Sequence, residues 1–176
     1  MSGRNRAVFL DRDGTLMEEV HYCGDPAQVK VYPGVTEALA RLKAAGFLTF
    51  IVTNQSGIGR GLFTFEQYEA VQQEVLRQIG DQFIDATYYC ADPPDVPSLR
   101  RKPEPGMLLE AARDFDIDLS QSVFIGDKAI DVECGRRAGT RTILVLSGYG
   151  EEQQRDCAAD FVAPDLPAAA ALVLDS

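Results

Sequence analysis

Two aspartates, Asp11 and Asp13, stand two residues apart directly after the apolar run 7–10, in the phrase D-R-D-G-T. Alternate residues of an extended segment point to the same side, so the two carboxylates should lie close together. Like charges in close company raise the pKa of one partner, which separates an ionised nucleophile from a protonated acid. A carboxylate can attack a phosphoryl group to form an acyl phosphate that water then hydrolyses. Gly14 permits a sharp turn that would aim backbone N–H groups at the phosphate, so the pattern predicts phosphoryl transfer.

A second acidic pair, Asp127 and Asp131, lies four residues apart, which places both carboxylates on one face of a helix. Together with Asp11 these residues could hold Mg²⁺, which takes few carboxylates, several waters and a substrate oxygen. Thr53 offers a neutral donor and Lys102 a positive charge to the phosphoryl oxygens that gain charge during transfer. The polar clusters thus predict a magnesium-assisted site.

The composition excludes most other routes to hydrolysis. Histidine-phosphate enzymes, multi-histidine metallophosphatases and most zinc hydrolases need several imidazoles, and His21 is the single histidine. No cysteine is followed six residues later by arginine, so the loop of the cysteine-nucleophile phosphatases is absent. The four cysteines lie far apart, which predicts free thiols in a reducing compartment. Any hydrolytic chemistry must therefore rest on carboxylates.

The charge balance is acidic: 17 Lys and Arg stand against 27 Asp and Glu, a net charge of −10 over 176 residues. Such a field disfavours nucleic acid and anionic membranes, because both need clustered cations. No apolar run is long enough to span a bilayer, and residues 1–6 lack the apolar core of a signal peptide. We expect one cytoplasmic domain over residues 1–176 that acts on a small molecule.

Short apolar runs alternate with amphipathic stretches, which is typical of βαβ units and a parallel sheet. Ligands of such sheets bind beyond the carboxyl ends of the strands, and each polar cluster follows a predicted strand or precedes a predicted helix. Thr64 and Gln67 have the spacing of a helix capping box. Strands are expected at 7–10, 47–52, 84–90, 123–125 and 142–146, helices at 34–45, 64–79, 105–115 and 129–138, and a short strand and helix within 156–176.

The ordered set D-R-D-G-T, V-T-N, Lys102 and G-D-K-A-I-D resembles the four motifs of the haloacid dehalogenase superfamily of phosphatases, over residues 7–148. The resemblance implies an α/β fold with a doubly wound, mainly parallel sheet and helices on both faces. It implies that Asp11 is the nucleophile and Asp13 the general acid/base, and that Thr53 and Lys102 are also catalytic. The implied Mg²⁺ ligands are Asp11, the backbone carbonyl of Asp13 and Asp127, with Asp131 in support.

The chain is also similar to the D-glycero-D-manno-heptose 1,7-bisphosphate phosphatases, which lack a large cap domain. The phrases F-L-D-R-D-G-T, V-T-N-Q-S-G-I-x-R-G, Y-Y-C, R-K-P-x-P-G-M-L and G-D-K carry this similarity. It implies removal of the 7-phosphate from the sugar bisphosphate. We separately expect a monomer or small homo-oligomer. The implied substrate contacts are Glu19, Val20, His21, Tyr22, Asn54, Gln55, Ser56, Arg101 and Lys128. Arg60, in the glycine-rich turn after Ser56, could reach a distal anionic group of the substrate.

One segment departs from that family, whose members usually carry a structural zinc loop, C-x-H followed by C-x-C, just before R-K-P. Here Cys90 holds the first position, but Asp92 stands in place of the histidine. Ser98 and Arg100 replace the two later cysteines. One thiol cannot build a tetrahedral zinc site. We therefore expect no structural Zn²⁺ and a proline-rich loop, 91–100, that is stiffened without metal.

Two other interpretations stay open at this point. Histidinol-phosphate phosphatases and other small-molecule sugar-phosphate phosphatases share the motifs, although Ser56 and Arg60 fit the heptose type better. A receiver-like signalling domain also uses an acidic pocket with Thr and Lys, but it places the phosphorylated aspartate after a middle strand. The spacing of Asp11 and Asp13 supplies a hydrolysing acid and favours the phosphatase.

Overall fold

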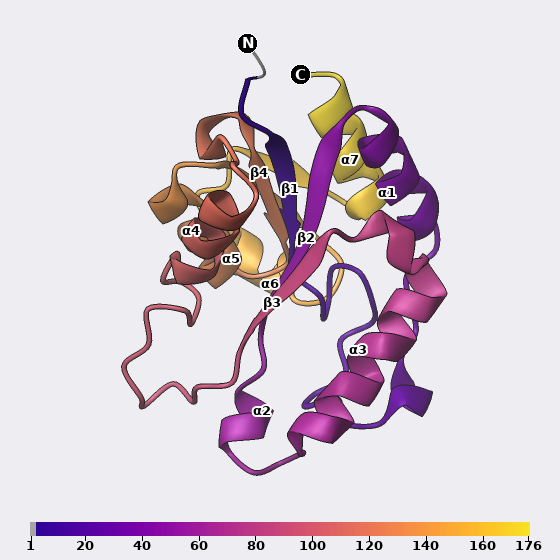
Figure 1. The fold of residues 1–176 in the computed structure, drawn as a ribbon, viewed down its shortest axis with the longest axis vertical. Helices are drawn as coiled ribbons and strands as arrows, with labels where there is room; N and C mark the ends of the chain where they lie inside the picture. The colour runs from indigo at the N-terminus through magenta and orange to yellow at the C-terminus, as the bar shows by residue number, and fades with distance from the viewer. Residues whose placement is uncertain (1–2) are drawn as a thin grey trace.

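The computed structural model describes residues 3–176 and is organised around one sheet (Figure 1). Residues 1 and 2, which begin the polar N-terminal stretch considered above, lie outside this range. The strand order is β3-β2-β1-β4-β5-β6, and every neighbouring pair is parallel. The strands are β1 (Arg6–Leu10), β2 (Phe47–Asn54), β3 (Ala86–Cys90), β4 (Val123–Gly126), β5 (Arg141–Val145) and β6 (Phe161–Ala163).

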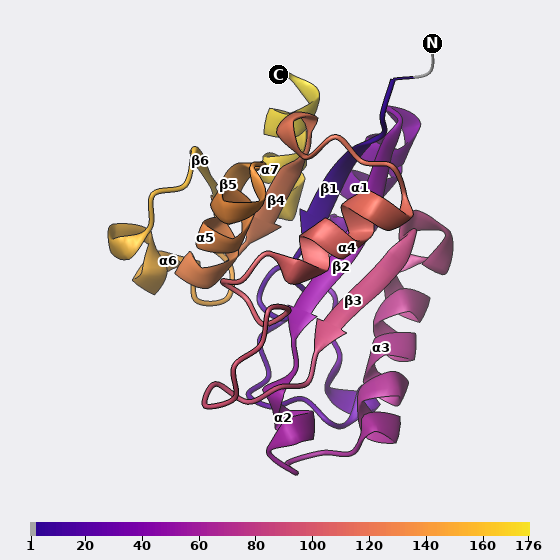
Figure 2. The same cartoon turned by 60° about the vertical axis from the view of Figure 1, so that its left-hand side comes forward.

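Helices cover both faces of the sheet, as Figures 1 and 2 show. One face packs against α1 (Val35–Ala44), α3 (Phe65–Ile79) and α7 (Leu166–Leu174), and the other against α4 (Gly106–Asp114) and α5 (Ala129–Ala138). The predicted doubly wound α/β fold is therefore confirmed, and no large cap domain is inserted within residues 3–176. No helix in that range is long and apolar enough to cross a bilayer.

Strand β1 shows why the apolar runs predict buried strands. Val8 and Leu10 join the core beneath α1, α3 and α7, whereas Ala7 and Phe9 join the core beneath α4 and α5. All four side chains are fully buried. A strand covered on both faces needs apolar residues at every position, so its sequence is a continuous apolar run without alternation.

Local signals set the helix ends. The Thr64 hydroxyl accepts from the backbone N–H of Gln67 at 3.1 Å, and the Gln67 side chain accepts from the backbone N–H of Thr64 at 2.8 Å, which completes the predicted capping box. Gly139 ends α5 with a φ of 86°, a conformation that favours glycine. Strand β3 begins two residues later than predicted, because residues 81–83 form a 3₁₀ turn in which the Asp81 carbonyl accepts from Ile84.

Two short helices, α2 (Ser56–Gly59) and α6 (Gly150–Gln153), were not predicted. Each is a single turn, which is too short to show an apolar period. Both lie after the carboxyl end of a strand, β2 and β5 respectively.

The order of the strands creates a crevice at the carboxyl edge of the sheet. Strands β1 and β4 are neighbours, although β2 and β3 lie between them in the chain. The chain therefore winds outward from β1 on one side and from β4 on the other. Ligands of doubly wound sheets bind at such a switch point, and the residues after β1 and β4 contain the D-x-D and G-D motifs.

Candidate active site

A cavity of about 390 Å³ opens at the carboxyl edge of the sheet. All four residues predicted to be catalytic line it, together with every predicted substrate contact except Arg60. Asp127 is fully buried, next to Asp11. The lining from the predicted set is Asp11, Asp13, Glu19, Val20, His21, Tyr22, Thr53, Asn54, Gln55, Ser56, Arg101, Lys102 and Lys128.

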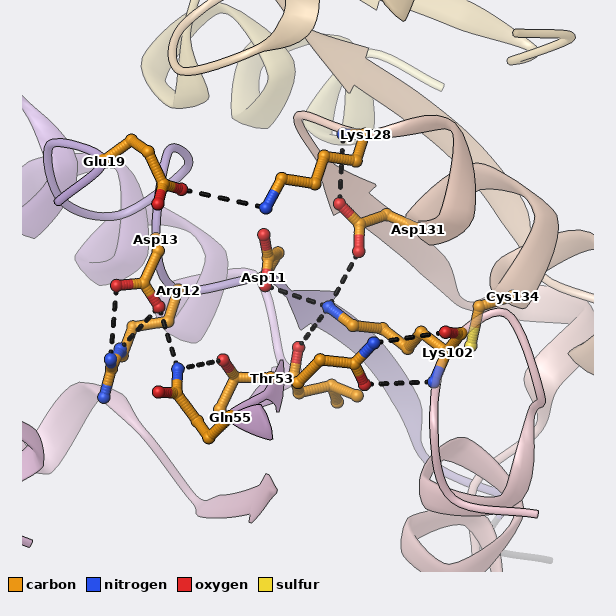
Figure 3. Close-up of polar contacts among 12 residues, drawn as sticks. Asp11, Arg12, Asp13, Glu19, Thr53, Gln55, Lys102, Lys128, Asp131 and Cys134 are labelled. Atoms are coloured by element: carbon orange, nitrogen blue, oxygen red, sulfur yellow. Dashed lines mark hydrogen bonds and ion pairs between the residues drawn. The ribbon is translucent and has the colours of Figure 1, made fainter. Parts of the chain in front are cut away.

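The Lys102 ammonium lies at the centre of the polar network (Figure 3). It donates to Asp11 Oδ1 at 2.9 Å and to the Val52 carbonyl at 2.9 Å, and it forms an ion pair with Asp131 Oδ1 at 2.7 Å. Two of these contacts are hydrogen bonds and the third is an ion pair, so one of the three N–H donors of the ammonium is not held by a hydrogen bond among residues 3–176. Lys102 is only 3% exposed. One lysine thus joins the segment before α4 to β1, β2 and α5.

Asn54 holds the backbone from which Lys102 projects. Its Nδ2 donates to the Lys102 carbonyl at 3.1 Å, and its Oδ1 accepts from the Lys102 N–H at 3.0 Å. The side chain of Asn54 was expected to contact substrate, and it does line the cavity. Its two hydrogen bonds also fix the backbone segment that carries Lys102.

The network keeps Asp11 ionised. Burial favours the neutral acid, but the charges of Lys102 and Lys128 and the hydrogen bond from Lys102 outweigh it and lower the pKa of Asp11. The carboxylates of Asp11 and Asp131 raise the pKa of Lys102 against the opposing effect of its burial. The pair is therefore charged at neutral pH. A buried, ionised carboxylate that faces a cavity is the form required of a nucleophile.

Three buried carboxylates, Asp11, Asp127 and Asp131, have oxygen atoms within 4.8 Å of one another. Asp131 is engaged: Oδ1 pairs with Lys102, and Oδ2 accepts from the Lys128 N–H at 3.1 Å. Asp127 Oδ2 accepts from the Tyr149 N–H at 2.9 Å, whereas its buried Oδ1 has no hydrogen-bond partner among residues 3–176.

Desolvation and the charges of Asp11 and Asp131 raise the pKa of Asp127 to about 9. A divalent cation bonded to Asp127 Oδ1 would offset both effects, and hard oxygen donors suit Mg²⁺. The residues present therefore fit the predicted metal, with Asp11 and Asp127 as carboxylate ligands. Gly14 is required beside them, because a Cβ there would come within 2.1 Å of Asp127 Oδ2.

The carboxylate of Asp13 was expected to lie close to that of Asp11, and its hydrogen-bond partners in the structure are Arg12 and Gln55. Arg12 donates to both carboxylate oxygens, from Nε to Oδ2 at 3.0 Å and from Nη2 to Oδ1 at 3.2 Å. Gln55 Nε2 also donates to Oδ2, at 3.0 Å, and to the Thr53 hydroxyl at 2.8 Å. The sequence analysis did not identify Arg12 as part of the site. Its side chain is fully buried.

Lys128 lines the cavity. Its Nζ lies 3.8 Å from Glu19 Oε2 and 5.0 Å from the centre of the Tyr149 ring. Burial of Lys128 is outweighed by the charges of Asp11, Glu19 and the two acids of the G-D motif, so its pKa is raised and it stays protonated. A second cation besides Lys102 is therefore available to an anionic ligand.

The rim is formed in part by an aromatic pair. His21 and Tyr22 pack edge to face, with ring centres 4.5 Å apart. The Arg60 guanidinium lies 5.9 Å from the Tyr22 ring and does not line the cavity, because the α2 turn carries it beyond Ser56 and Gly57, which do. The role of Arg60 at a distal anionic group of the substrate therefore stays a prediction.

Hydrogen bonds order the loop that precedes Arg101. The buried Cys90 thiol donates to Asp92 Oδ2 at 3.5 Å and lies 3.6 Å from the Ser98 hydroxyl. That hydroxyl accepts from the backbone N–H groups of Arg100 and Arg101, each at 3.3 Å. Arg101 Nη1 donates to the Asp92 carbonyl at 3.0 Å. The loop therefore has an internal polar cluster beside the cavity.

Several lining residues were missed, above all Tyr149 and Gln153, which belong to the segment after β5. The Tyr149 backbone holds Asp127, and Gln153 Oε1 accepts from the Ala129 N–H at 3.0 Å, at the start of α5. The available signal was position: this segment leaves the carboxyl end of a strand in the same sheet. The remaining missed residues are Cys23, Gly57 and Ile130.

Comparison with known proteins shows what the chain is similar to. Residues 99–169 match the family model described as HAD-hydrolase-like. A D-glycero-D-manno-heptose-1,7-bisphosphate 7-phosphatase of Thermosynechococcus vestitus is 39% identical over 93% of this chain and 92% of its own length. The protein of the same name from Chlorobaculum tepidum is 39% identical over 92% of this chain and 90% of its own.

A solved structure gives the same result. The crystal structure of D,D-heptose 1,7-bisphosphate phosphatase from B. bronchiseptica, complexed with magnesium and phosphate, matches with a TM-score of 0.89 and 31% identity. The match covers 97% of this chain and 98% of that one. The fold, the ordered motifs and these similarities define the class of the chain, a haloacid dehalogenase-like phosphatase. Within that class, it belongs to the family of the D-glycero-D-manno-heptose-1,7-bisphosphate 7-phosphatases, and a receiver-like domain is not supported.

The ion-pair network makes a prediction about stability. In Lys102→Met, Asp11 and Asp131 lose their buried counter-charge, so the free energy of unfolding at pH 7 should fall by about 3–5 kcal/mol. Lys30→Met is the matched control, because Lys30 is 69% exposed and its pair with Glu18 spans 3.8 Å. The control should cost no more than about 1 kcal/mol. Urea unfolding without added metal measures both, and equal small losses would contradict the importance of the network.

Proposed function

We propose that this chain is a Mg²⁺-dependent phosphatase that hydrolyses a phosphomonoester through an aspartyl phosphate on Asp11. The observation that carries the proposal is the environment of Asp11. Its carboxylate is held ionised by Lys102, lines the cavity and lies beside the unbonded oxygen of Asp127. A nucleophile, a counter-charge and a metal-binding oxygen are thus in one place.

The reaction has two displacements. In the first, an oxygen of Asp11 attacks phosphorus, the bond from phosphorus to the ester oxygen breaks, and Asp13 gives its proton to the departing oxygen. In the second, a water oxygen attacks phosphorus, Asp13 takes a proton from that water, and Asp11 leaves as a carboxylate. Inorganic phosphate is released, and Asp13 is again the acid. Thr53 and Lys102 lie where they can orient the phosphoryl oxygens.

We assign the metal to Asp11, Asp127 and the backbone carbonyl of Asp13. When bound, Mg²⁺ would neutralise part of the charge on the transferred phosphoryl group. Asp131 is engaged with Lys102 and the Lys128 backbone, which supports the secondary role proposed for it. We propose no structural Zn²⁺ in the loop after Cys90, because hydrogen bonds to Asp92 and Ser98 already engage that thiol.

We propose D-glycero-D-manno-heptose 1,7-bisphosphate as the substrate, with the 7-phosphate removed. The names of the relatives support this choice. Arg101 and Lys128 add two cations to the cavity besides Lys102. They supply local attraction for a second phosphate in a chain whose net charge is −10. Arginine can pair with a phosphate through two parallel hydrogen bonds.

Substitution of the nucleophile tests the covalent route. Asp11→Asn should lower kcat by on the order of 10⁴-fold or more while the protein stays folded, because an amide cannot form the acyl phosphate. Asp116→Asn, at a carboxylate that is 77% exposed, is the control and should be fully active. Steady-state phosphate release and circular dichroism measure the two effects. Substantial turnover by folded, metal-loaded Asp11→Asn would contradict the mechanism.

Metal dependence gives a second test. Treatment with EDTA should stop phosphate release, and added Mg²⁺ should restore it, because Asp11 and Asp127 would regain their cation. Zinc analysis of protein purified without added metal should find clearly substoichiometric zinc. Activity that survives complete metal removal would refute the magnesium assignment, and stoichiometric, tightly held zinc would refute the assignment of the Cys90 loop.

Specificity gives a third test. Arg101→Ala should lower kcat/KM for the heptose bisphosphate by roughly 10–100-fold, because charged hydrogen bonds to the second phosphate of the substrate would be lost. Hydrolysis of a small aryl phosphate should change little. Arg100→Ala is the matched control, because Arg100 pairs with Glu110 at 3.0 Å and does not line the cavity. Parallel loss on both substrates in Arg101→Ala would mean that Arg101 serves the transferred phosphate or the fold.

A further inference from the structure

Arg12, the residue between the two aspartates of the D-x-D motif, has an unusual environment. It is 0% exposed and is among the largest fully buried side chains of residues 3–176. Its backbone carbonyl accepts N–H groups from Thr15, Leu16 and Met17, a contact that any residue could provide. The particular contribution of arginine must therefore come from its guanidinium.

The guanidinium connects the catalytic loop to α3 and β3. Nη1 donates to Gln72 Oε1 at 3.4 Å, and the group lies 5.7 Å from the centre of the Tyr68 ring, both in α3. Gln72 in turn donates to the Thr87 hydroxyl of β3 at 3.1 Å. These contacts fix the plane of the guanidinium. Nε and Nη2 are then aimed at Asp13, the one carboxylate among residues 3–176 with which the guanidinium pairs.

Stability alone does not explain a charge at this position. Burying an ion pair carries a large desolvation cost, and a well-packed apolar side chain is often as stabilising or more so. An apolar residue could fill the space beside Tyr68 equally well. Such a residue would lose the fork, the two parallel hydrogen bonds from the guanidinium to Asp13.

The bonds to Asp13 distinguish its two oxygens (Figure 3). Oδ2 accepts from Arg12 Nε and from Gln55 Nε2, which occupies both of its lone pairs. Oδ1 accepts only from Arg12 Nη2 among residues 3–176, so one lone pair is left. Asp13 lines the cavity and its side chain is 15% exposed. The oxygen that can exchange a proton with a ligand is therefore Oδ1.

We propose that Arg12 is a positioning residue, which holds the Asp13 carboxyl so that Oδ1 delivers the proton to the leaving oxygen and later takes one from the attacking water. This inference rests on the proposed acid–base role of Asp13. Arg12 touches neither substrate nor phosphorus, and it acts through the geometry of Asp13. Loss of the fork should therefore affect most the esters whose leaving group needs a proton.

The test compares the activity of Arg12→Met on two esters. One is heptose 1,7-bisphosphate, which is an alkyl phosphate. The other is 4-nitrophenyl phosphate, an aryl phosphate whose leaving group needs little protonation. The variant should lose about 100-fold in kcat/KM on the alkyl ester, as misplacement of a catalytic group does, and no more than about 3-fold on the aryl ester. Arg137→Met, at a surface arginine that pairs with Glu133 and Glu104, should change neither. Equal losses on both esters, or none, would overturn the proposal.

Asp13→Asn, measured in parallel, separates this inference from the proposed function. If Asp13→Asn shows the dependence on leaving group and Arg12→Met does not, only the positioning role fails. If Asp13→Asn itself shows no such dependence, the acid–base role fails and the inference falls with it. The double variant should be within about 3-fold of Asp13→Asn on the alkyl ester, because residues that act through one another are not additive.

Arg12→Lys keeps the test decisive should Arg12→Met fail to fold. Lysine retains the charge and can bond Asp13, but it lacks the planar fork. Arg12→Lys should also lose more kcat/KM on the alkyl ester than on the aryl ester, but the loss on the alkyl ester should be smaller, about 10-fold. Activity of Arg12→Lys that equals the unmutated protein on both esters would show that a charge suffices and would overturn the geometric role.

Discussion

The Lys102 ammonium contacts Asp11 at the end of β1, Val52 in β2 and Asp131 in α5, and Asn54 clamps the backbone that carries it. A buried ammonium without its counter-charges would cost several kcal/mol. The ends of β1 and β2 and the start of α5 must therefore keep fixed relative positions. Because these elements meet at the switch point of the sheet, a single charged group links the strand order to the ionisation of Asp11.

The same interaction gives three neighbouring carboxylates different properties. Lys102 and Lys128 lower the pKa of Asp11 against the effect of burial. Burial and the Asp11 charge raise the pKa of Asp131 to about 6, an increase that Lys102 limits. Asp127 forms no ion pair with a lysine among residues 3–176, and burial together with the charges of Asp11 and Asp131 raises its pKa to about 9. Lys102, the one buried lysine of the site, cannot form ion pairs with three acids, so Asp127, the acid without an ion pair in the described part of the chain, lies where a divalent cation would bind, next to the nucleophile.

Much of this arrangement could be predicted from the sequence, where local chemistry decides the outcome. Thr64 and Gly139 mark helix ends through their own hydrogen bonds and backbone freedom, and Asp11 follows an apolar run whose length and composition predict a buried strand. Arg12 could not be predicted, because an arginine between two aspartates has the pattern of a surface cation. Its burial depends on the ring and amide that α3 brings to it from a distant part of the chain. Tyr149 likewise joins the site only through the path of the chain after β5.

The central claim is that phosphorus undergoes two successive displacements, the first by Asp11. An in-line displacement inverts the configuration at phosphorus, and a second one restores it. The most direct measurement is therefore the stereochemical course of hydrolysis of a phosphate ester made chiral at phosphorus with sulfur and oxygen isotopes. Net retention in the released thiophosphate is the result that this mechanism predicts. Inversion would mean that water attacks the ester directly and that Asp11 is not the nucleophile.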